Sequence, residues 1–210
     1  MNATNSKVIG LMGAVGSGKS TVAGMLRSLG ASVHDADRAA HEALREPEAK
    51  AAALALLGPG ILGPDGEADR KRIAERVFQD PAALKGLEAI LHPRVRRRME
   101  AWMAAERAQG APALVLDIPL LAEAGLDTLC DLLLFVDTPA ALRDARVQGD
   151  RGWTAEETAR RQARQGALDA KRGRAHAVIE NAGSLAETRV HVEAFWNQFV
   201  NGTVNQGGSR

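Results

Sequence analysis

Short apolar runs alternate along the chain with longer segments in which apolar residues recur every three or four positions. The apolar runs, bounded by polar or turn-forming residues, lie at 7–13, 31–37, 113–119, 132–137 and 177–181. Such runs are typical of strands buried on both faces of a parallel sheet. The helical patterns lie at 18–29, 38–57, 69–80, 81–109, 139–148, 154–168 and 184–199. This alternation predicts a three-layer α/β fold with a five-stranded, mostly parallel sheet between helices.

Residues typical of helix N-termini precede several of these helical segments. They are Asp80 before Pro81, Thr138 before Pro139, Thr154, and Ser184. Side-chain oxygens of these types accept hydrogen bonds from the unpaired amides of a first helical turn, and proline is tolerated there. We therefore expect helices to begin at these positions.

One stretch departs from the alternation. Residues 38–110 are almost entirely helical around a Gly/Pro-rich loop at 57–69. A crossover between parallel strands needs far fewer residues, so we expect an inserted helical subdomain at 38–110 in a core formed by 1–37 and 111–200. The polar, Gly-rich end at 201–210 is predicted to be a disordered tail.

Length and composition narrow the class of protein. The 210 residues fit one domain with insertions, and 27 Lys+Arg against 26 Asp+Glu leave no basic field for nucleic acid or an anionic membrane. The single cysteine, Cys130, lies in an apolar segment, where we expect a buried thiol. No signal peptide or long apolar span is recognisable. We expect a cytoplasmic protein that is a monomer or a weak homo-oligomer.

A basic segment, "HPRVRRRME" at 92–100, carries four arginines on one predicted helix. It could bind RNA or the anionic end of a substrate. The balanced total charge and the aromatic content of 3% favour a solvated basic face.

The first predicted strand leads into a glycine-rich loop. Gly13, Gly18, Lys19 and Ser20 fill the pattern G-x-x-x-x-G-K-[ST], and a predicted helix follows. Glycine lets the backbone wrap a phosphate group closely, and the helix N-terminus adds partial positive charge. The loop is therefore predicted to bind a nucleotide through its backbone, with Gly16 and Ser17 included.

The polar side chains of this loop predict its ligand, ATP with Mg²⁺. Lys19 can bridge the β and γ phosphates, and the Ser20 hydroxyl can coordinate Mg²⁺. Thr21 is expected near the α phosphate, although an ordinary threonine early in a helix would look the same. Asp117, at the end of the third predicted strand, is a second candidate for Mg²⁺, and Glu123 is a weaker one.

Three classes of nucleotide-binding protein fit such a loop. A GTPase should carry N-K-x-D and D-x-x-G signatures, which are absent at useful places, and a motor ATPase would be larger. A small-molecule kinase is favoured, and it requires a base for the acceptor hydroxyl. A regulatory module that binds ATP without transferring phosphate remains open.

Two carboxylates suit that base. Asp35 and Asp37 end the second predicted strand, where residues two apart share a face and where ligands gather in parallel sheets. One acid can accept the hydroxyl proton while the other orders water at Mg²⁺ or holds its partner. The alternative is that Asp37 only caps a helix starting at Arg38.

These residues resemble the dephospho-CoA kinase family over about 7–199. The likeness rests on "GSGKST" (16–21), "DAD" (35–37), "DGEADR" (65–70), "LHP" (91–93), "PLL" (119–121) and "IENAG" (179–183). The resemblance implies a P-loop NTPase fold with a lid, and phosphorylation of the ribose 3′-hydroxyl of dephospho-CoA by ATP, the last step of coenzyme A synthesis.

The resemblance also implies roles for single residues. Asp37 would be the base, supported by Asp35. The inserted helical region would bind the dephospho-CoA acceptor. The residues carried over for that acceptor are Arg70, His92 and Pro119.

On the nucleotide side, the resemblance implies Asn181 as an adenine contact and a lid at about 145–168. Arg146 and Arg151 are its candidates to reach over the phosphates. Two departures from the family are visible: the loop begins Gly13-Ala14-Val15 rather than Gly-Gly-Ile, and the lid lacks the usual "R-D-G". A nucleoside or nucleotide kinase remains the alternative within the kinases.

Overall fold

The computed structural model describes residues 6–78, 80–118, 121–152, 154–163 and 165–202. The chain forms two compact units, one from Met1–His34 with Ala105–Arg210 and one from Asp35–Ala104. This division falls near the boundaries expected for the helical insertion. No helix in the described part combines the length and apolar character needed to cross a bilayer.

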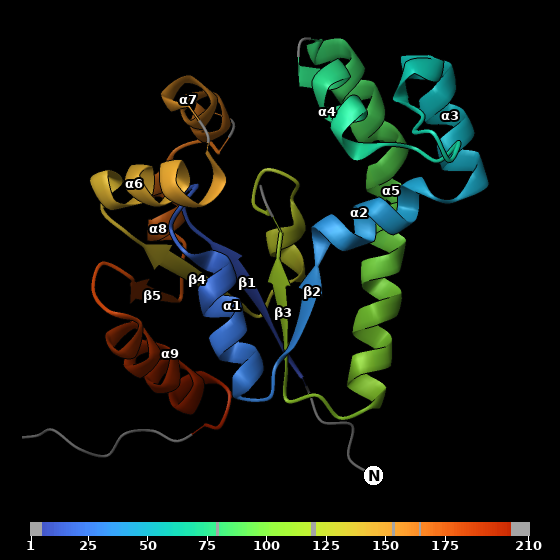
Figure 1. The fold of residues 1–210 in the computed structure, drawn as a ribbon. Coiled ribbons are helices and arrows are strands. Elements are labelled where there is room, and N and C mark those ends of the chain that lie inside the picture. Colours follow the sequence, from blue (N-terminus) through green and yellow to red (C-terminus); the bar gives the residue numbers. More distant parts are fainter. Residues whose placement is uncertain (1–5, 79, 119–120, 153, 164, 203–210) are drawn as a thin grey trace, which may run out of the picture. The chain divides into compact units, whose positions relative to one another are not determined.

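The first unit is built on a five-stranded sheet (Figure 1). Its strands, in the spatial order β2-β3-β1-β4-β5, are β1 (Lys7–Met12), β2 (Ser32–Asp35), β3 (Ala113–Asp117), β4 (Leu132–Asp137) and β5 (Ala177–Glu180). Strand β1 pairs in parallel with β3 and β4, and β4 pairs in parallel with β5. Strand residues that face either side of the sheet are buried, as in Leu132–Val136 of β4. The predicted sheet is confirmed.

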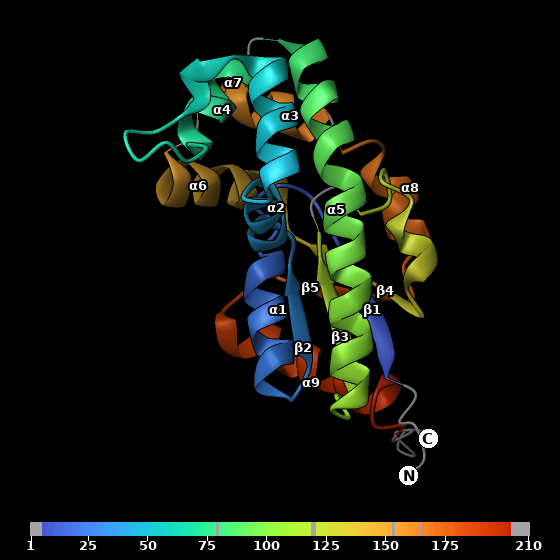
Figure 2. The same cartoon turned by 90° about the vertical axis from the view of Figure 1, so that its right-hand side faces the viewer.

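Helices cover both faces of this sheet. Helices α1 (Lys19–Ser28) and α9 (Leu185–Phe199) lie together on one face, and Figure 2 shows α8 (Leu168–Gly173) on the other. Leu26 of α1 and Phe195 of α9 join Ile9 and Leu134 of the sheet in one buried cluster. Full burial of such a side chain contributes about 1.5–3 kcal/mol, so the helix that follows the glycine-rich loop is firmly anchored.

The remaining helices of this unit are η2 (Leu126–Leu129), α6 (Ala140–Arg151) and α7 (Ala155–Ala163). The single helix expected at 154–168 is wrong, because α7 ends at Ala163 and Gly166 takes a positive φ of 62° before α8 begins. Cys130, beside η2, is half-buried, and burial, with help from Asp127 and Asp131, raises its thiol pKa to about 12.

The second unit is helical and has its own apolar core. It contains α2 (Ala36–Leu44), α3 (Pro47–Leu57), η1 (Pro59–Ile61), α4 (Arg70–Phe78) and most of α5 (Pro81–Ala108). Buried Leu57, Ile61, Ile73 and Leu87 belong to its core. The one helix expected at 38–57 is two, because Pro47 cannot donate a helical hydrogen bond and starts α3 instead.

Three of the four expected caps are present. Asp80 accepts hydrogen bonds from the Ala82 and Ala83 amides, Thr154 accepts one from Glu157, and Ser184 forms a capping box with Glu187. The cap expected at Thr138 is wrong. Its hydroxyl donates to the Ser17 carbonyl at 3.0 Å instead, so it serves the glycine-rich loop.

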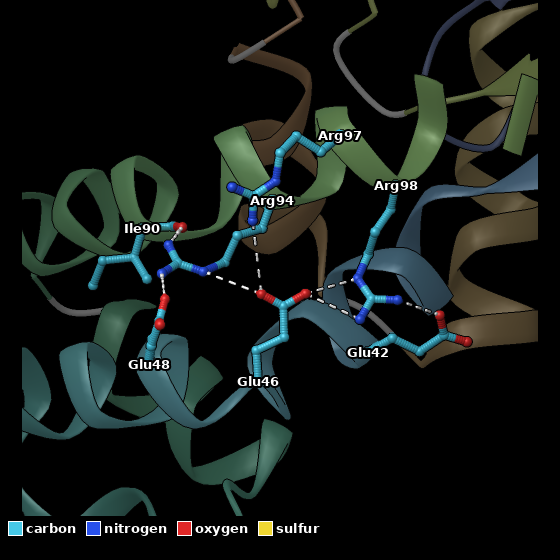
Figure 3. A network of polar contacts seen from close by, with 7 residues as sticks. All are labelled: Glu42, Glu46, Glu48, Ile90, Arg94, Arg97 and Arg98. Atoms are coloured by element: carbon cyan, nitrogen blue, oxygen red, sulfur yellow. Dashed lines mark hydrogen bonds and ion pairs between the residues drawn. The ribbon is translucent and has the colours of Figure 1, made fainter. Parts of the chain in front are cut away.

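Three of the arginines in the basic segment of α5 form an ion-pair network (Figure 3). Glu46, in the turn between α2 and α3, lies 3.4 Å from Arg94, 4.0 Å from Arg97 and 3.0 Å from Arg98. Arg98 also pairs with Glu42 at 3.2 Å. Single exposed pairs contribute little, but a shared carboxylate holds several partners in one geometry. The network fastens α5 to the α2–α3 turn. Arg96 and Arg97 stay mostly exposed to solvent, as expected, whereas the ion pairs with Glu46 were not predicted from the sequence.

Candidate active site

The carboxyl ends of the parallel strands collect polar residues at one edge of the sheet. The glycine-rich loop follows β1, Asp117 ends β3, Thr138 follows β4 and Asn181 follows β5. In open parallel sheets this edge is where ligands bind. The first unit therefore contains a candidate nucleotide site that its own residues build.

The loop backbone requires glycine at Gly16 and Gly18. Their φ angles are 75° and 87°, in the left-handed region that other residues rarely adopt. A Cβ atom at Gly16 would lie 2.7 Å from the Arg143 carbonyl oxygen, and one at Gly18 would collide with the Asn181 amide. Side chains are sterically excluded at these two positions, so the backbone amides of the loop can approach a bound ligand closely.

Lys19 lies folded back on this loop. Its Nζ donates to the carbonyl oxygens of Gly13 and Ala14, each at 2.9 Å. The Ala14 carbonyl also accepts a hydrogen bond from the Ser17 amide at 3.2 Å. The lysine charge is therefore held at the loop, within reach of a bound phosphate.

Ser20 and Asp117 are brought together from α1 and β3. The Ser20 hydroxyl donates to Asp117 Oδ2 at 3.2 Å. A hydroxyl and a carboxylate are oxygen ligands of the kind that Mg²⁺ prefers, and Mg²⁺ usually takes its other ligands from water and substrate phosphates. The pair fits a nucleotide-borne Mg²⁺, although the described residues contain no cluster of three or more His, Cys, Asp or Glu that could hold a metal by itself.

Asn181 links β5 to the loop. Its Nδ2 donates to the Ser17 carbonyl at 2.8 Å, and its Oδ1 accepts from Thr188 at 2.8 Å. The residue is only 3% exposed. With Thr138, it fixes the Ser17 carbonyl, and because a trans peptide points its N–H away from its C=O, the Gly18 amide faces the opposite side.

This geometry bears on the adenine contact expected of Asn181. Both ends of its amide are engaged within the protein, and its buried position leaves little surface for a base. The adenine role stays a prediction that the hydrogen bonding disfavours, whereas a supporting role for the loop is directly visible.

Of the two arginines expected in a lid, Arg146 lies beside Gly18 of the loop. Its Nη2 donates to the Asn181 carbonyl at 3.0 Å. Its Nη1 is buried and has no hydrogen-bond partner among the described residues. That nitrogen lies 3.7 Å from the position of a Cβ on Gly18, so it can serve a ligand at the loop. Arg151 ends α6, and its side chain lies outside the described part.

Sequence reasoning missed Gln165 and Lys171. Both line a small pocket beside the loop, together with Met12, Gly13, Lys19, Ile118, Leu121 and Ala122. Lys171 forms an ion pair with Glu123, the weaker of the two acidic residues considered for Mg²⁺ from the sequence. Neither residue belongs to a motif, and the only available signal was their place near the end of the expected lid.

The acidic pair differs from the expected geometry. Strand β2 ends at Asp35 and α2 begins at Ala36, so Asp37 lies in a helix and the extended-chain argument is wrong. Asp35, rather than Asp37, is the cap, because its side chain accepts from the Arg38 amide at 2.9 Å. The carboxylate of Asp37 is exposed in the first turn.

The predicted acceptor residues belong mostly to the second unit. Arg70 begins α4 and is exposed, and His92 is an exposed residue within α5. Pro119 lies outside the described residues.

The strand order, the glycine-rich loop and the Lys19 and Ser20 side chains define a kinase of the P-loop class. The dephospho-CoA kinase family model matches residues 7–187. The chain therefore belongs to the dephospho-CoA kinase family.

Individual relatives agree with this assignment. The chain is 43% identical to a dephospho-CoA kinase of Symbiobacterium thermophilum, over 93% of this chain and 82% of that protein. It is also 43% identical to one of Deinococcus radiodurans, over 93% of each chain. Among solved structures, TT1252 from Thermus thermophilus superposes with a TM-score of 0.78 at 37% identity, covering 92% of this chain and 98% of that one.

Proposed function

We propose that this chain transfers the γ-phosphoryl group of ATP to the ribose 3′-hydroxyl of dephospho-CoA, giving coenzyme A and ADP. The observation that carries the proposal is the glycine-rich loop with Lys19 and the Ser20–Asp117 pair, in a chain of this family. The reaction fits a site that offers charge and positioning rather than a nucleophilic side chain.

Mg²⁺ is proposed to enter with ATP and to be held by Ser20 and Asp117. When bound, it would neutralise charge on the β and γ phosphate oxygens. Lys19 would leave the loop carbonyls to contact the same phosphates, and the Gly18 amide would donate to them. Arg146, through its buried Nη1, is proposed to add a further donor. Arg151 remains a second lid candidate.

For the acceptor, we propose Asp37 as the base. The 3′-oxygen attacks the γ-phosphorus, the bond from that phosphorus to the β–γ bridging oxygen breaks, and the hydroxyl proton passes to the Asp37 carboxylate. Asp35 supports this role by capping α2, which fixes the turn that carries Asp37. Arg70, His92 and Pro119 are proposed to bind dephospho-CoA, and Asn181 to serve the ATP side of the site.

We further propose a cytoplasmic protein that acts as a monomer or a weak homo-oligomer, with neither nucleic acid nor membrane as partner. Cys130 is the single cysteine of the sequence, so no internal disulfide can form, which suits a reducing compartment. Light scattering of the purified protein measures the oligomeric state.

The deciding experiment is ADP production by the purified protein with ATP and Mg²⁺. Dephospho-CoA is compared with adenosine, AMP and no acceptor, and the mass of the product is checked for one added phosphate. We expect ADP release only with dephospho-CoA. Release with adenosine or AMP instead would indicate a nucleoside or nucleotide kinase, and ATP binding without acceptor-dependent release would indicate a regulatory module.

Lys19→Met is the internal control for this assay. Removal of the loop lysine should lower turnover by about a thousandfold or more, on the scale of other charges that act on the transferring phosphoryl group. Turnover close to that of the wild type would show that the observed kinase activity does not arise at this loop.

A further inference from the structure

Gln165 makes an unusual contact with the glycine-rich loop. The residue follows α7, is only 6% exposed, and lies 150 positions beyond the loop residue it meets. Its Oε1 accepts a hydrogen bond from the Val15 amide at 2.9 Å, and its Nε2 donates to the Gly13 carbonyl at 3.4 Å. One side-chain amide thus serves both a donor and an acceptor of the loop backbone.

The Gly13 carbonyl is shared between Gln165 and Lys19. Lys19 Nζ donates to the carbonyls of Gly13 and Ala14 at 2.9 Å. If Lys19 turns toward a phosphate, the Ala14 carbonyl keeps its hydrogen bond from the Ser17 amide. Among the described residues, the Gly13 carbonyl would then keep only Gln165. Both loop residues are buried, and a buried carbonyl without a partner is costly.

We propose that Gln165 is a positioning residue that takes over the Gly13 carbonyl when Lys19 moves to bound ATP. The inference rests on the proposed nucleotide binding at this loop, and it makes Gln165 act through Lys19 rather than on substrate. The 3.4 Å contact shortens as the lysine leaves.

The primary test is Gln165→Met, which keeps the length of the side chain and removes both hydrogen-bonding groups. We expect ATP to bind about tenfold more weakly, the scale of one or two lost hydrogen bonds. The Val15 amide loses its acceptor in the free protein as well, so the melting temperature should fall by a few degrees. The affinity for dephospho-CoA should stay close to wild type. Gln162→Met, on α7 and partly exposed, is the matched control and should bind ATP normally.

The Lys19→Met background separates positioning from packing. In that background no lysine leaves the Gly13 carbonyl when ATP binds. Adding Gln165→Met should therefore change ATP affinity by less than about twofold, so the effects of the two substitutions should not be additive. Calorimetry or a fluorescent ATP analogue measures all four proteins. A tenfold loss that persists in the Lys19→Met background would overturn the proposal, as would wild-type ATP affinity in the single variant.

Gln165→Glu provides a second, independent variant if the methionine side chain is not tolerated. It keeps an acceptor for the Val15 amide but cannot donate to Gly13, so it should also lose affinity, and unchanged ATP binding would refute the donor role. These measurements need no acceptor. Failure to phosphorylate dephospho-CoA would therefore leave them readable, whereas a wild-type protein that does not bind ATP would overturn both proposals.

Discussion

Asp37 is exposed in the first turn of α2, and its neighbour Asp35 already caps that helix. The two acids can therefore be tested apart. Asp37→Asn should lower kcat about a hundredfold or more, the usual scale for loss of a general base, while ATP binding is retained. Steady-state assays of ADP release measure kcat of the wild type and the variant.

Asp35→Asn is the matched control for this prediction, because asparagine caps a helix about as well as aspartate. It should keep the start of α2 and cost far less in turnover than Asp37→Asn. Equal turnover in wild type and Asp37→Asn would leave Asp37 as an ordinary residue of a first helical turn.

Asn181 gives a second prediction at the scale of one residue, because its amide is bonded to the Ser17 carbonyl and to Thr188. Asn181→Leu keeps the volume and removes two buried hydrogen bonds, although the Ser17 carbonyl keeps Thr138 and the Thr188 hydroxyl keeps the Ser184 carbonyl. The free energy of unfolding should therefore fall by about 1–3 kcal/mol, the scale of two lost hydrogen bonds. Binding of ATP, GTP and tripolyphosphate should weaken by similar factors, since the loop itself is disturbed. Urea titration and calorimetry measure these changes.

A different pattern would support the adenine contact. If Asn181 read the base, the leucine variant would lose affinity for ATP while its affinity for tripolyphosphate stayed unchanged. Thr188→Val tests the same network from α9 without touching the loop, and it should reproduce a smaller loss of stability.

Among the helices, the N-terminal cap of α9 should make the stability of the protein depend on pH. Hydrogen bonds from the Ser184 amide and then the Ser184 hydroxyl lower the pKa of Glu187. A carboxyl whose folded pKa is depressed contributes stability above its unfolded pKa of about 4.3, and that contribution is lost as the pH falls through the folded value. Wild type should therefore exceed Glu187→Gln in stability at neutral pH, and the difference should shrink in acid.

Urea unfolding at a series of pH values measures that difference. Glu193→Gln, on the same helix but outside the cap, is the control and should not reproduce the pattern. A gap between wild type and Glu187→Gln that is constant from neutral to acid pH would contradict the assigned cap.

The elements also show what a sequence can predict. The buried strands and the loop motif were predicted because their signals are local: apolar runs, and glycines next to Lys19 and Ser20. The helix breaks near Pro47 and Gly166 were missed because the helical spacing of apolar residues continues across both turns and hides them.

Support of the loop was missed for a different reason. Thr138 and Gln165 bind the loop backbone from 121 and 150 or more residues away. Backbone carbonyls and amides are the same at every position, so their partners leave no mark in the pattern of the sequence. The position of Asp37 within a helix was missed because the strand ends two residues earlier than its apolar run suggested.

At the scale of the whole molecule, the two units suggest a division of labour. The loop, its metal-binding candidates and the residues that support it all lie in the unit of Met1–His34 and Ala105–Arg210. The proposed base and most proposed acceptor residues lie in Asp35–Ala104, which has its own core and its own ion-pair network around Glu46. Each ligand should therefore stabilise mainly one unit.

Hydrogen exchange measured by mass spectrometry tests this division. A ligand protects the amides whose local opening it suppresses. ATP with Mg²⁺ should slow exchange in the loop at 13–20 and near Gln165, and dephospho-CoA alone should slow exchange within 35–104. Lys19→Met, which should bind ATP more weakly, should show less of the first effect at the same ATP concentration and keep the second. Protection by dephospho-CoA confined to the first unit would remove the helical unit from acceptor binding, and with it the case for Asp37 as the base.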